Sequence, residues 1–218
     1  MKEFMQMKLI LFIIEVMVSK KLIIAPHVDD DVLGCGGIMD ENTFVLYCGV
    51  DDFHIIGRND RLKEADDVKD LLGHSYTLLE NKVNSYVLQD LIASFQEHIN
   101  SHKPDVIYIP HPSYNQDHRA VYEAALVALR PHDINYFVKK VIVYEQPHVF
   151  LWDHNYGEFK PNYFVPIDID RKIKAYELMK SQLREFRGIE KVKALALLRG
   201  GQSDCEYAEA FQILRWID

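Results

Sequence analysis

The sequence predicts an α/β fold in which helices flank a mostly parallel, Rossmann-like sheet. Short apolar runs rich in β-branched residues alternate with longer segments of helical periodicity as far as about residue 145. Such alternation is typical of parallel sheets, because two parallel strands must be joined by a crossover that is usually a helix. Beyond residue 150 the chain becomes aromatic and loop-like, which predicts a C-terminal elaboration of this fold.

The individual elements follow from the same patterns. Apolar runs predict strands at residues 21–26, 43–49, 75–79, 105–109 and 140–144. Helical spacing predicts helices at 59–72, 87–102 and 117–129, with Gly73 as the C-cap of the first and Pro104 stopping the second. We expect a further short strand at 165–167, and two or three helical segments from residue 171 to the C-terminus.

Length and composition predict one globular domain over residues 1–218, of which residues 1–18 are an N-terminal extension. The 218 residues are 48% hydrophobic and 27% charged, which is typical of globular domains. The formal net charge of -8 argues against a nucleic-acid partner, because phosphate backbones attract basic surfaces. Three widely spaced cysteines indicate reduced thiols, and therefore a cytoplasmic location.

The N-terminal extension contains an apolar run at residues 9–14 that resembles the core of a signal peptide. Glu15 interrupts the run, and no small-residue cleavage site follows it. A membrane-spanning helix needs about 20 apolar residues, so this run is too short to cross a bilayer. We therefore do not expect a membrane partner.

The first candidate site comes directly after the first predicted strand. His27, Asp29, Asp30 and Asp31 follow that strand, and the glycine-rich turn 34–37 comes next. Ligand sites of open α/β sheets form outside the carboxyl ends of the strands. Three consecutive carboxylates repel one another, so their convergence requires a cation or solvent. Considered alone, the segment is explained as well by a solvated loop with a helix N-cap.

A second cluster has the same placement, because His111, Asn115, Asp117 and His118 follow the predicted strand at 105–109. If the two strands are parallel, both clusters lie at one edge of the sheet. Two histidines and one carboxylate with an open fourth position form a common catalytic zinc site, and the same ligand set also binds non-haem iron. We therefore predict a Zn²⁺ site, with Fe²⁺ as the alternative metal.

Two longer motifs surround these residues. Residues 25–31 read Ala-Pro-His-Val-Asp-Asp-Asp before the glycine-rich turn, and residues 117–121 read Asp-His-Arg-Ala-Val. The joint pattern resembles the PIG-L/LmbE-like N-acetylglucosamine deacetylases, whose first motif is Ala-Pro-His-Pro-Asp-Asp-Glu, and the similarity extends over roughly residues 21–215. The resemblance implies a zinc-dependent hydrolase that removes the N-acetyl group from an N-acetylglucosamine-like amino sugar, either as a small molecule or as part of a glycan.

Carried over by position, the resemblance also implies roles for single residues. The implied metal ligands are His27, Asp30 and His118. Asp29 would be the general base that activates the attacking water, and Asp117 would be a carboxylate supporting the site from behind the ligands. The implied substrate-facing residues are Arg61 and Asn115, and the further family positions that match are Glu64, Arg199 and Glu209.

Three positions depart from the family pattern. Val28 replaces a proline, and Asp31 replaces a glutamate. Asn115 stands where many relatives have a histidine, and an asparagine donates a hydrogen bond but cannot supply a proton. Either Asp29 therefore carries both proton transfers, or His111 or His148 supplies the second proton.

Other functions remain open at this stage. The same metal site would serve an amidase acting on another N-acyl metabolite, and Asn115 would fit a non-catalytic carbohydrate-binding relative, although the retained Asp29 argues against that. A nucleotide-binding protein is disfavoured, because the glycines at 34–37 lack the GxGxxG spacing. The segment 150–164 is rich in aromatic residues, which would line a sugar site, belong to the core or form a contact between copies of the chain. They are Phe150, Trp152, Tyr156, Phe159, Tyr163 and Phe164.

Overall fold

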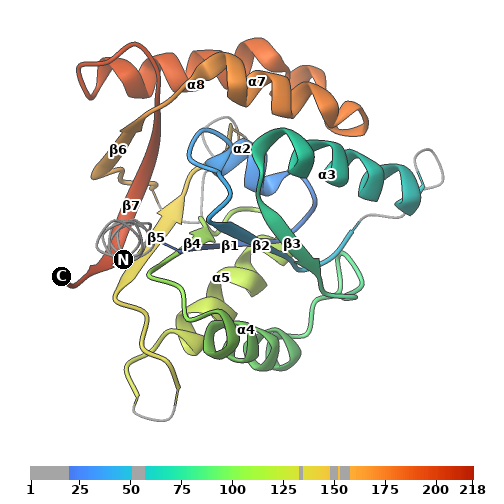
Figure 1. Ribbon diagram of the computed structural model, residues 1–218, viewed down its shortest axis with the longest axis vertical. Helices are drawn as coiled ribbons and strands as arrows, with labels where there is room; N and C mark the ends of the chain where they lie inside the picture. The colour runs from blue at the N-terminus through green and yellow to red at the C-terminus, as the bar shows by residue number, and fades with distance from the viewer. Residues whose placement is uncertain (1–19, 51–56, 133–134, 148–151, 153–157) are drawn as a thin grey trace, which may run out of the picture.

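The protein is described by a computed structural model that covers residues 20–50, 57–132, 135–147, 152 and 158–218. Within these residues a seven-stranded sheet has the order β3-β2-β1-β4-β5-β7-β6 (Figure 1). The strands from β3 to β5 are parallel, and β7 is antiparallel to both of its neighbours. The bounds are β1 Lys21–Ala25, β2 Thr43–Tyr47, β3 Ser75–Leu78, β4 Val106–Pro110, β5 Lys140–Tyr144, β6 Tyr163–Pro166 and β7 Ala208–Trp216.

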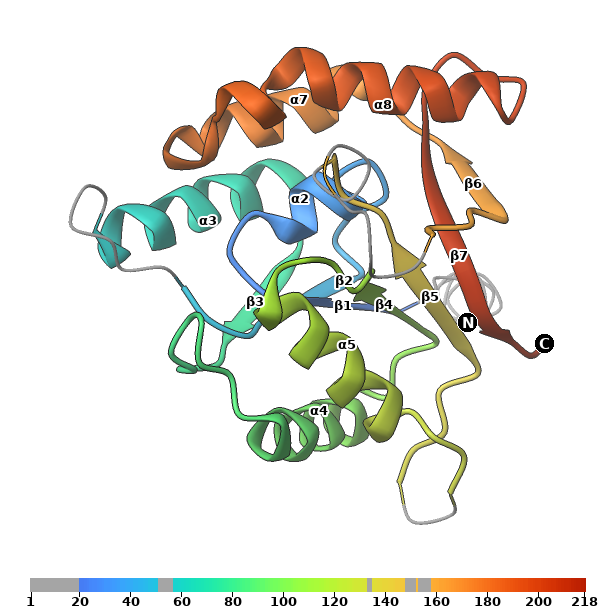
Figure 2. The ribbon, with the colours of Figure 1, turned by 180° about the vertical axis from the view of Figure 1, so that it is seen from behind.

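Helices cover both faces of this sheet, as Figures 1 and 2 show. One face carries α4 (Leu88–His102) and α5 (Gln116–Ala128). The other face carries α2 (Asp30–Cys35), α3 (Arg58–Leu72), α7 (Ile169–Leu178) and α8 (Ile189–Gly201). Two short 3-10 turns, η1 (Lys180–Gln182) and η2 (Glu185–Arg187), join α7 to α8. The arrangement confirms the predicted α/β fold with a mostly parallel sheet.

Strand β1 illustrates why the sheet needs helices on both faces. Its alternate residues Leu22 and Ile24 belong to the core that packs under α4 and α5, whereas Ile23 belongs to the core on the opposite face. All three are buried. A strand that buries side chains on both faces reads as an unbroken apolar run, and this run predicted the strand.

The predicted strands and helices before residue 145 all form, with bounds that differ by at most two residues. Gly73 ends α3 in a left-handed conformation with φ 85°, which confirms its predicted role as a C-cap.

The expectation of helical segments up to the C-terminus was wrong for the last of them, because Ala208–Trp216 is the strand β7. Alanine, glutamate and leucine in this segment favour a helix locally. Pairing with β5 on one side and β6 on the other overrides that preference, a long-range contact that local sequence does not encode.

The strand order places a topological switch point between β1 and β4. From β1 the chain proceeds outward through β2 and β3, and it then returns to add β4 on the other side of β1. The connections after β1 and β4 leave toward opposite faces, into α2 and α5 (Figure 2). This divergence opens the crevice in which open α/β sheets bind ligands. No described helix has the length and apolarity needed to cross a bilayer.

Candidate metal centre

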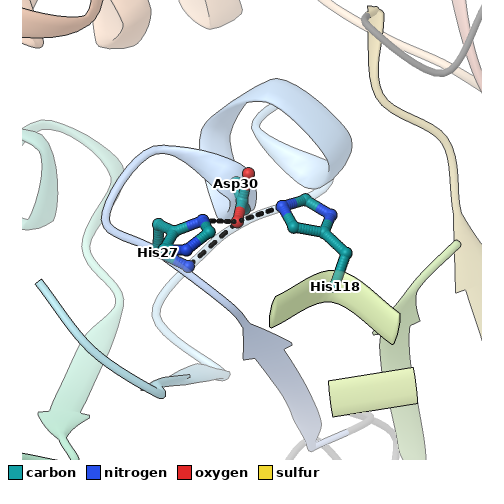
Figure 3. Close-up of side chains that lie close together, drawn as sticks. All are labelled: His27, Asp30 and His118. Carbon is teal, nitrogen blue, oxygen red and sulfur yellow. Dashed lines mark hydrogen bonds and ion pairs between the residues drawn. The ribbon is translucent and has the colours of Figure 1, made fainter. Parts of the chain in front are cut away.

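Three side chains from the two sequence clusters meet at the switch point. His27 follows β1, Asp30 begins α2, and His118 lies in the first turn of α5. The carboxylate oxygen Oδ2 of Asp30 lies 3.3 Å from Nδ1 of His27 and 3.2 Å from Nε2 of His118 (Figure 3). One potential ligand atom of each residue lies within 4.8 Å of the other two, and the three residues are buried.

This arrangement fits a tetrahedral divalent ion. Ligands about 2.0–2.1 Å from a tetrahedral centre are separated from one another by roughly 3.4 Å. The two separations from Asp30 Oδ2 agree with that edge length. Two ring nitrogens next to one carboxylate oxygen attract it only when a proton or a cation lies between them, so the donor set suits a positive charge at its centre.

Asp117 orients His27 from the side opposite Asp30. Its Oδ2 lies 3.0 Å from Nε2 of His27 and also accepts a hydrogen bond of 2.7 Å from the backbone N–H of Asn84. A hydrogen bond donated by Nε2 leaves the lone pair of His27 on Nδ1, which faces Asp30. A carboxylate behind a ligating histidine is the usual support for a metal-binding imidazole.

The charges of the site depend strongly on one another. Burial lowers the pKa of His27, but the carboxylates of Asp117 and Asp30 outweigh burial and raise it to about 10. Burial likewise raises the pKa of Asp30, but the imidazoles of His118 and His27 hold that pKa well below its ordinary value. The carboxylates of the centre therefore favour a positive charge there, which a bound ion would supply in place of the proton on Nδ1 of His27.

The three consecutive carboxylates do not converge; each points to a different partner. Asp29 forms an ion pair with Arg187, in which Oδ2 lies 2.9 Å from Nη1. Asp30 faces the two histidines, and Asp31 accepts a hydrogen bond of 2.7 Å from the hydroxyl of Tyr47. Burial raises the pKa of Asp31 to about 7, although the Tyr47 hydroxyl opposes the shift. The predicted repulsion is thus avoided by separating the side chains.

The backbone of Asp29 is strained. Its φ of 153° and ψ of -23° lie in a region that non-glycine residues rarely adopt, and it is the N-cap residue of α2. Strain of this kind persists only where the surrounding structure enforces it, and it is concentrated at functional sites.

Asp29 lines a cleft of about 230 Å³ next to the three candidate ligand residues. Besides Asp29, His27, Asp30 and His118, the lining residues are Val83, Asn84, Tyr114, Asn115, Gln182, Phe186 and Arg187. Asn115 caps α5, because its Oδ1 accepts a hydrogen bond of 2.8 Å from the backbone N–H of Asp117. This orientation leaves its Nδ2 group as the donor for the cleft.

Two residues considered for the site, Arg61 and His111, lie outside the cleft lining. Arg61 is buried, and its Nη2 donates a hydrogen bond of 2.7 Å to the carbonyl oxygen of Val28. His111 packs edge-on against the ring of Phe159. His148 lies outside the described residues. His111, which was considered as a second proton donor, is therefore not part of the cleft wall.

The other matching positions, Glu64, Arg199 and Glu209, each contact a residue of another part of the chain. Glu64 accepts hydrogen bonds from the backbone and the hydroxyl of Ser181. Arg199 forms a buried ion pair with Glu145, and Glu209 forms one with Lys172. These partners anchor α7 and α8 to the rest of the fold.

Two polar contacts of the site are not predicted by the sequence patterns. Arg187 reaches Asp29 from η2, and the Nε2 group of Gln146 donates a hydrogen bond of 2.7 Å to Oδ1 of Asp30. Gln146 follows β5, so its position past a strand end was an available signal. Arg187 follows no strand, and nothing local marks it.

Comparisons with solved structures agree with the fold. The conserved protein TT1542 from Thermus thermophilus has 23% identity and a TM-score of 0.74 over 92% of this chain and 97% of that chain. The N,N'-diacetylchitobiose deacetylase from Pyrococcus horikoshii has 21% identity and a TM-score of 0.75 over 90% of this chain and 84% of that chain. GalB from Pseudomonas putida, the 4-carboxy-2-hydroxymuconate hydratase, has 19% identity and a TM-score of 0.70 over 92% and 98%.

Deacetylases of A40926 pseudoaglycone and of teicoplanin, the latter in a zinc-inhibited form, are also similar. These two and the chitobiose deacetylase are PIG-L/LmbE-type deacetylases, so the chain has the fold that the sequence resemblance implies. Identities of 23% and below establish that shared fold and no more. Neither a protein-family model nor a curated protein sequence matches the chain.

Proposed function

We propose that this chain is a metal-dependent N-deacetylase of the PIG-L/LmbE-like type, a hydrolase of a linear amide C–N bond. The observation that carries the proposal is the placement of Asp29 in one cleft with His27, Asp30 and His118. The fold alone does not determine the reaction, because a hydratase has a similar fold. The ligand set, the adjacent carboxylate and the two sequence motifs favour amide hydrolysis.

His27, Asp30 and His118 would hold the ion, which we take to be Zn²⁺ with Fe²⁺ as the alternative. When bound, such an ion supplies Lewis-acid polarisation of the amide carbonyl and makes water easier to deprotonate. Asp117 keeps His27 in the tautomer that presents Nδ1 to the centre.

The remaining steps belong to Asp29 and Asn115. Asp29 accepts a proton from the attacking water as the new C–O bond forms, and Nδ2 of Asn115 donates a hydrogen bond to the oxyanion. The same proton then passes from Asp29 to the amide nitrogen as the C–N bond breaks, which releases acetate and an amine. Because Asn115 cannot supply a proton and His111 lies outside the cleft lining, we assign both transfers to Asp29, with His148, which lies outside the described residues, as the alternative second donor.

We propose an N-acetylglucosamine-like substrate, free or within a larger glycan. A cleft of about 230 Å³ with the exposed aromatic rings of Tyr114 and Phe186 on its walls suits a single sugar unit. The cysteines at positions 35, 48 and 205 are free thiols, which fits a reducing cytoplasm. An amidase for another N-acyl metabolite is the alternative that a substrate panel tests.

The test combines metal analysis with acetate release. Wild-type protein, Asp29→Asn, His118→Ala and the control Asp170→Asn, an exposed carboxylate on α7, are assayed on N-acetylated sugars and N-acetylated amino acids. We expect one metal ion per chain and metal-dependent acetate release from an amino sugar. Asp29→Asn should keep the ion and lose turnover, and His118→Ala should lose both. An ion retained in His118→Ala, or a metal-loaded wild type inactive on the whole panel, would contradict the proposal.

A further inference from the structure

Arg187 occupies an unusual position relative to the proposed base. It comes from η2, on the connection between α7 and α8, and its Nη1 lies 2.9 Å from Oδ2 of Asp29. The exposed fractions of the two side chains are 14% and 4%, so the ion pair is shielded from water. Among the described residues that line the cleft, Arg187 is the one Lys or Arg side chain. A shielded, charge-assisted contact of this kind is strong and directional.

The guanidinium group is itself held in place. Its Nη2 donates a hydrogen bond of 2.8 Å to Oε1 of Gln182. The hydroxyl of Tyr176 donates to the carbonyl oxygens of Arg187, at 2.9 Å, and of Gln182, at 3.1 Å. Tyr176 lies in α7 and is buried. These contacts tie the connection to α7, so Arg187 reaches Asp29 from a fixed support.

Asp29 has a particular need for such a partner. Its backbone conformation is strained, and the terminal torsion of an aspartate carboxylate is broad and poorly defined by itself. The ion pair fixes Oδ2, and Oδ1 is then the oxygen that can exchange a proton.

The permanent charge of an arginine side chain also suits a base that first accepts a proton and then donates it. An arginine remains protonated under all ordinary conditions, so it pairs with Asp29 before the base has taken the proton and again after the base has released it. Asn115 cannot supply a proton, so in the proposed mechanism Asp29 performs both proton transfers. Its carboxylate must therefore keep the same orientation through both of them.

We propose that Arg187 is a positioning residue that holds the Asp29 carboxylate in its reactive orientation. The inference rests on the proposed hydrolase function. The proton moves from water to Oδ1 of Asp29 as the C–O bond forms, and from Oδ1 to the leaving nitrogen as the C–N bond breaks. Arg187 neither gains nor loses a proton in either step.

The kinetic test uses Arg187→Lys, Arg187→Met and Arg187→Ala, with Arg184→Met as the matched control. Arg184 is an exposed arginine on the same connection. We expect kcat of Arg187→Met to fall about 100-fold with KM unchanged, since a misplacement of about 1 Å in a reacting group has that effect. Arg187→Lys should keep more activity, added guanidinium should restore part of kcat in Arg187→Ala, and Arg184→Met should behave as wild type. A raised KM at unchanged kcat would make Arg187 a substrate-binding group and overturn the inference.

A second measurement does not depend on activity. Crystal structures of wild type and Arg187→Lys, both with metal bound, and of Arg187→Met are compared at Asp29. In Arg187→Met we expect the carboxylate of Asp29 to turn away from its wild-type orientation, or the Asp29 backbone to relax. In Arg187→Lys we expect Asp29 to keep its wild-type geometry. An Asp29 that keeps its wild-type geometry in Arg187→Met overturns the positioning role, whether or not a substrate is known. An inactive wild type with a displaced Asp29 in Arg187→Met would instead reject the proposed reaction and leave the positioning contact intact.

Discussion

Nε2 of His27 and Oδ2 of Asp117 lie 3.0 Å apart in a buried contact. The contact selects the imidazole nitrogen that faces Asp30, so in the proposed metal site Asp117 would influence metal binding without being a ligand itself. We expect Asp117→Asn to weaken metal affinity by about 10- to 100-fold, measured by competition with a chelator. Glu123→Gln, an exposed change on the same helix, is the control. Equal affinities of wild type and Asp117→Asn would show that Asp117 does not support the ligand.

Gly34 allows α2 to pack directly on the ring of Tyr144. A Cβ added at Gly34 would overlap that ring, whose hydroxyl donates a hydrogen bond of 3.0 Å to the carbonyl oxygen of Ile24. We expect Gly34→Ala to lower the free energy of unfolding by about 1–3 kcal/mol through overpacking. Gly201→Ala is the matched control, because nothing lies within 4 Å of its added Cβ, and it should stabilise by roughly 0.5 kcal/mol. Denaturant unfolding of both variants measures the difference, and equal effects would refute this account of Gly34.

His74 should make the fold sensitive to acid. Burial, with a smaller contribution from the charge of Lys69, lowers the pKa of His74 from 6.5 to about 4, and neither ring nitrogen has a hydrogen-bond partner among the described residues. The unfolded chain therefore binds a proton at His74 more readily than the folded chain does. Stability falls as the pH drops from about 6.5 to about 4, by on the order of 3 kcal/mol at most from this residue.

The variant His74→Leu removes this linkage while keeping a side chain of similar size. We expect the midpoint of urea unfolding to fall less between about pH 6.5 and about pH 4 in His74→Leu than in wild type. Parallel curves for the two proteins would assign the acid sensitivity to other groups.

The ion pair between Lys172 and Glu209 should be structural. Nζ of Lys172 lies 2.5 Å from Oε1 of Glu209, which also accepts a hydrogen bond of 2.8 Å from the backbone N–H of Gly37. Both side chains are buried. We expect Lys172→Met to reduce stability by about 3–5 kcal/mol, because it leaves a carboxylate buried without its cation.

The double variant Lys172→Met/Glu209→Gln should lose less free energy of unfolding than the sum of the losses in the two single variants. Metal content per chain should stay at the wild-type value in all three variants that remain folded. Loss of the ion in folded Glu209→Gln would instead connect this position to the metal site.

The sequence predicted the parallel part of the sheet well because each element there is encoded locally. Buried strands are unbroken apolar runs, and Gly73 and Pro104 mark helix ends. The strand β7 was missed because its partners, β5 and β6, are distant in sequence and its own residues favour a helix. Tertiary pairing decided its conformation.

The candidate ligands were predictable for a related reason. His27, Asp30 and His118 follow the carboxyl ends of strands that the patterns identified, so topology alone brings them together. Arg187 was not predictable, because its contact with Asp29 depends on how the connection between α7 and α8 folds back over the cleft. The buried position of Arg61 likewise depends on the path of the loop that contains Val28.

The candidate ligand residues belong to segments that are far apart in sequence and are therefore synthesised at different times. A growing chain that ends before β4 contains His27 and Asp30 but neither β4 nor the helix that carries His118. Such a fragment has two of the three candidate ligands and lacks the strand that pairs with β1 on the side of His118. An ion bound to all three residues would link the two sides of the switch point, so the candidate site can be complete only after β4 and α5 have joined β1.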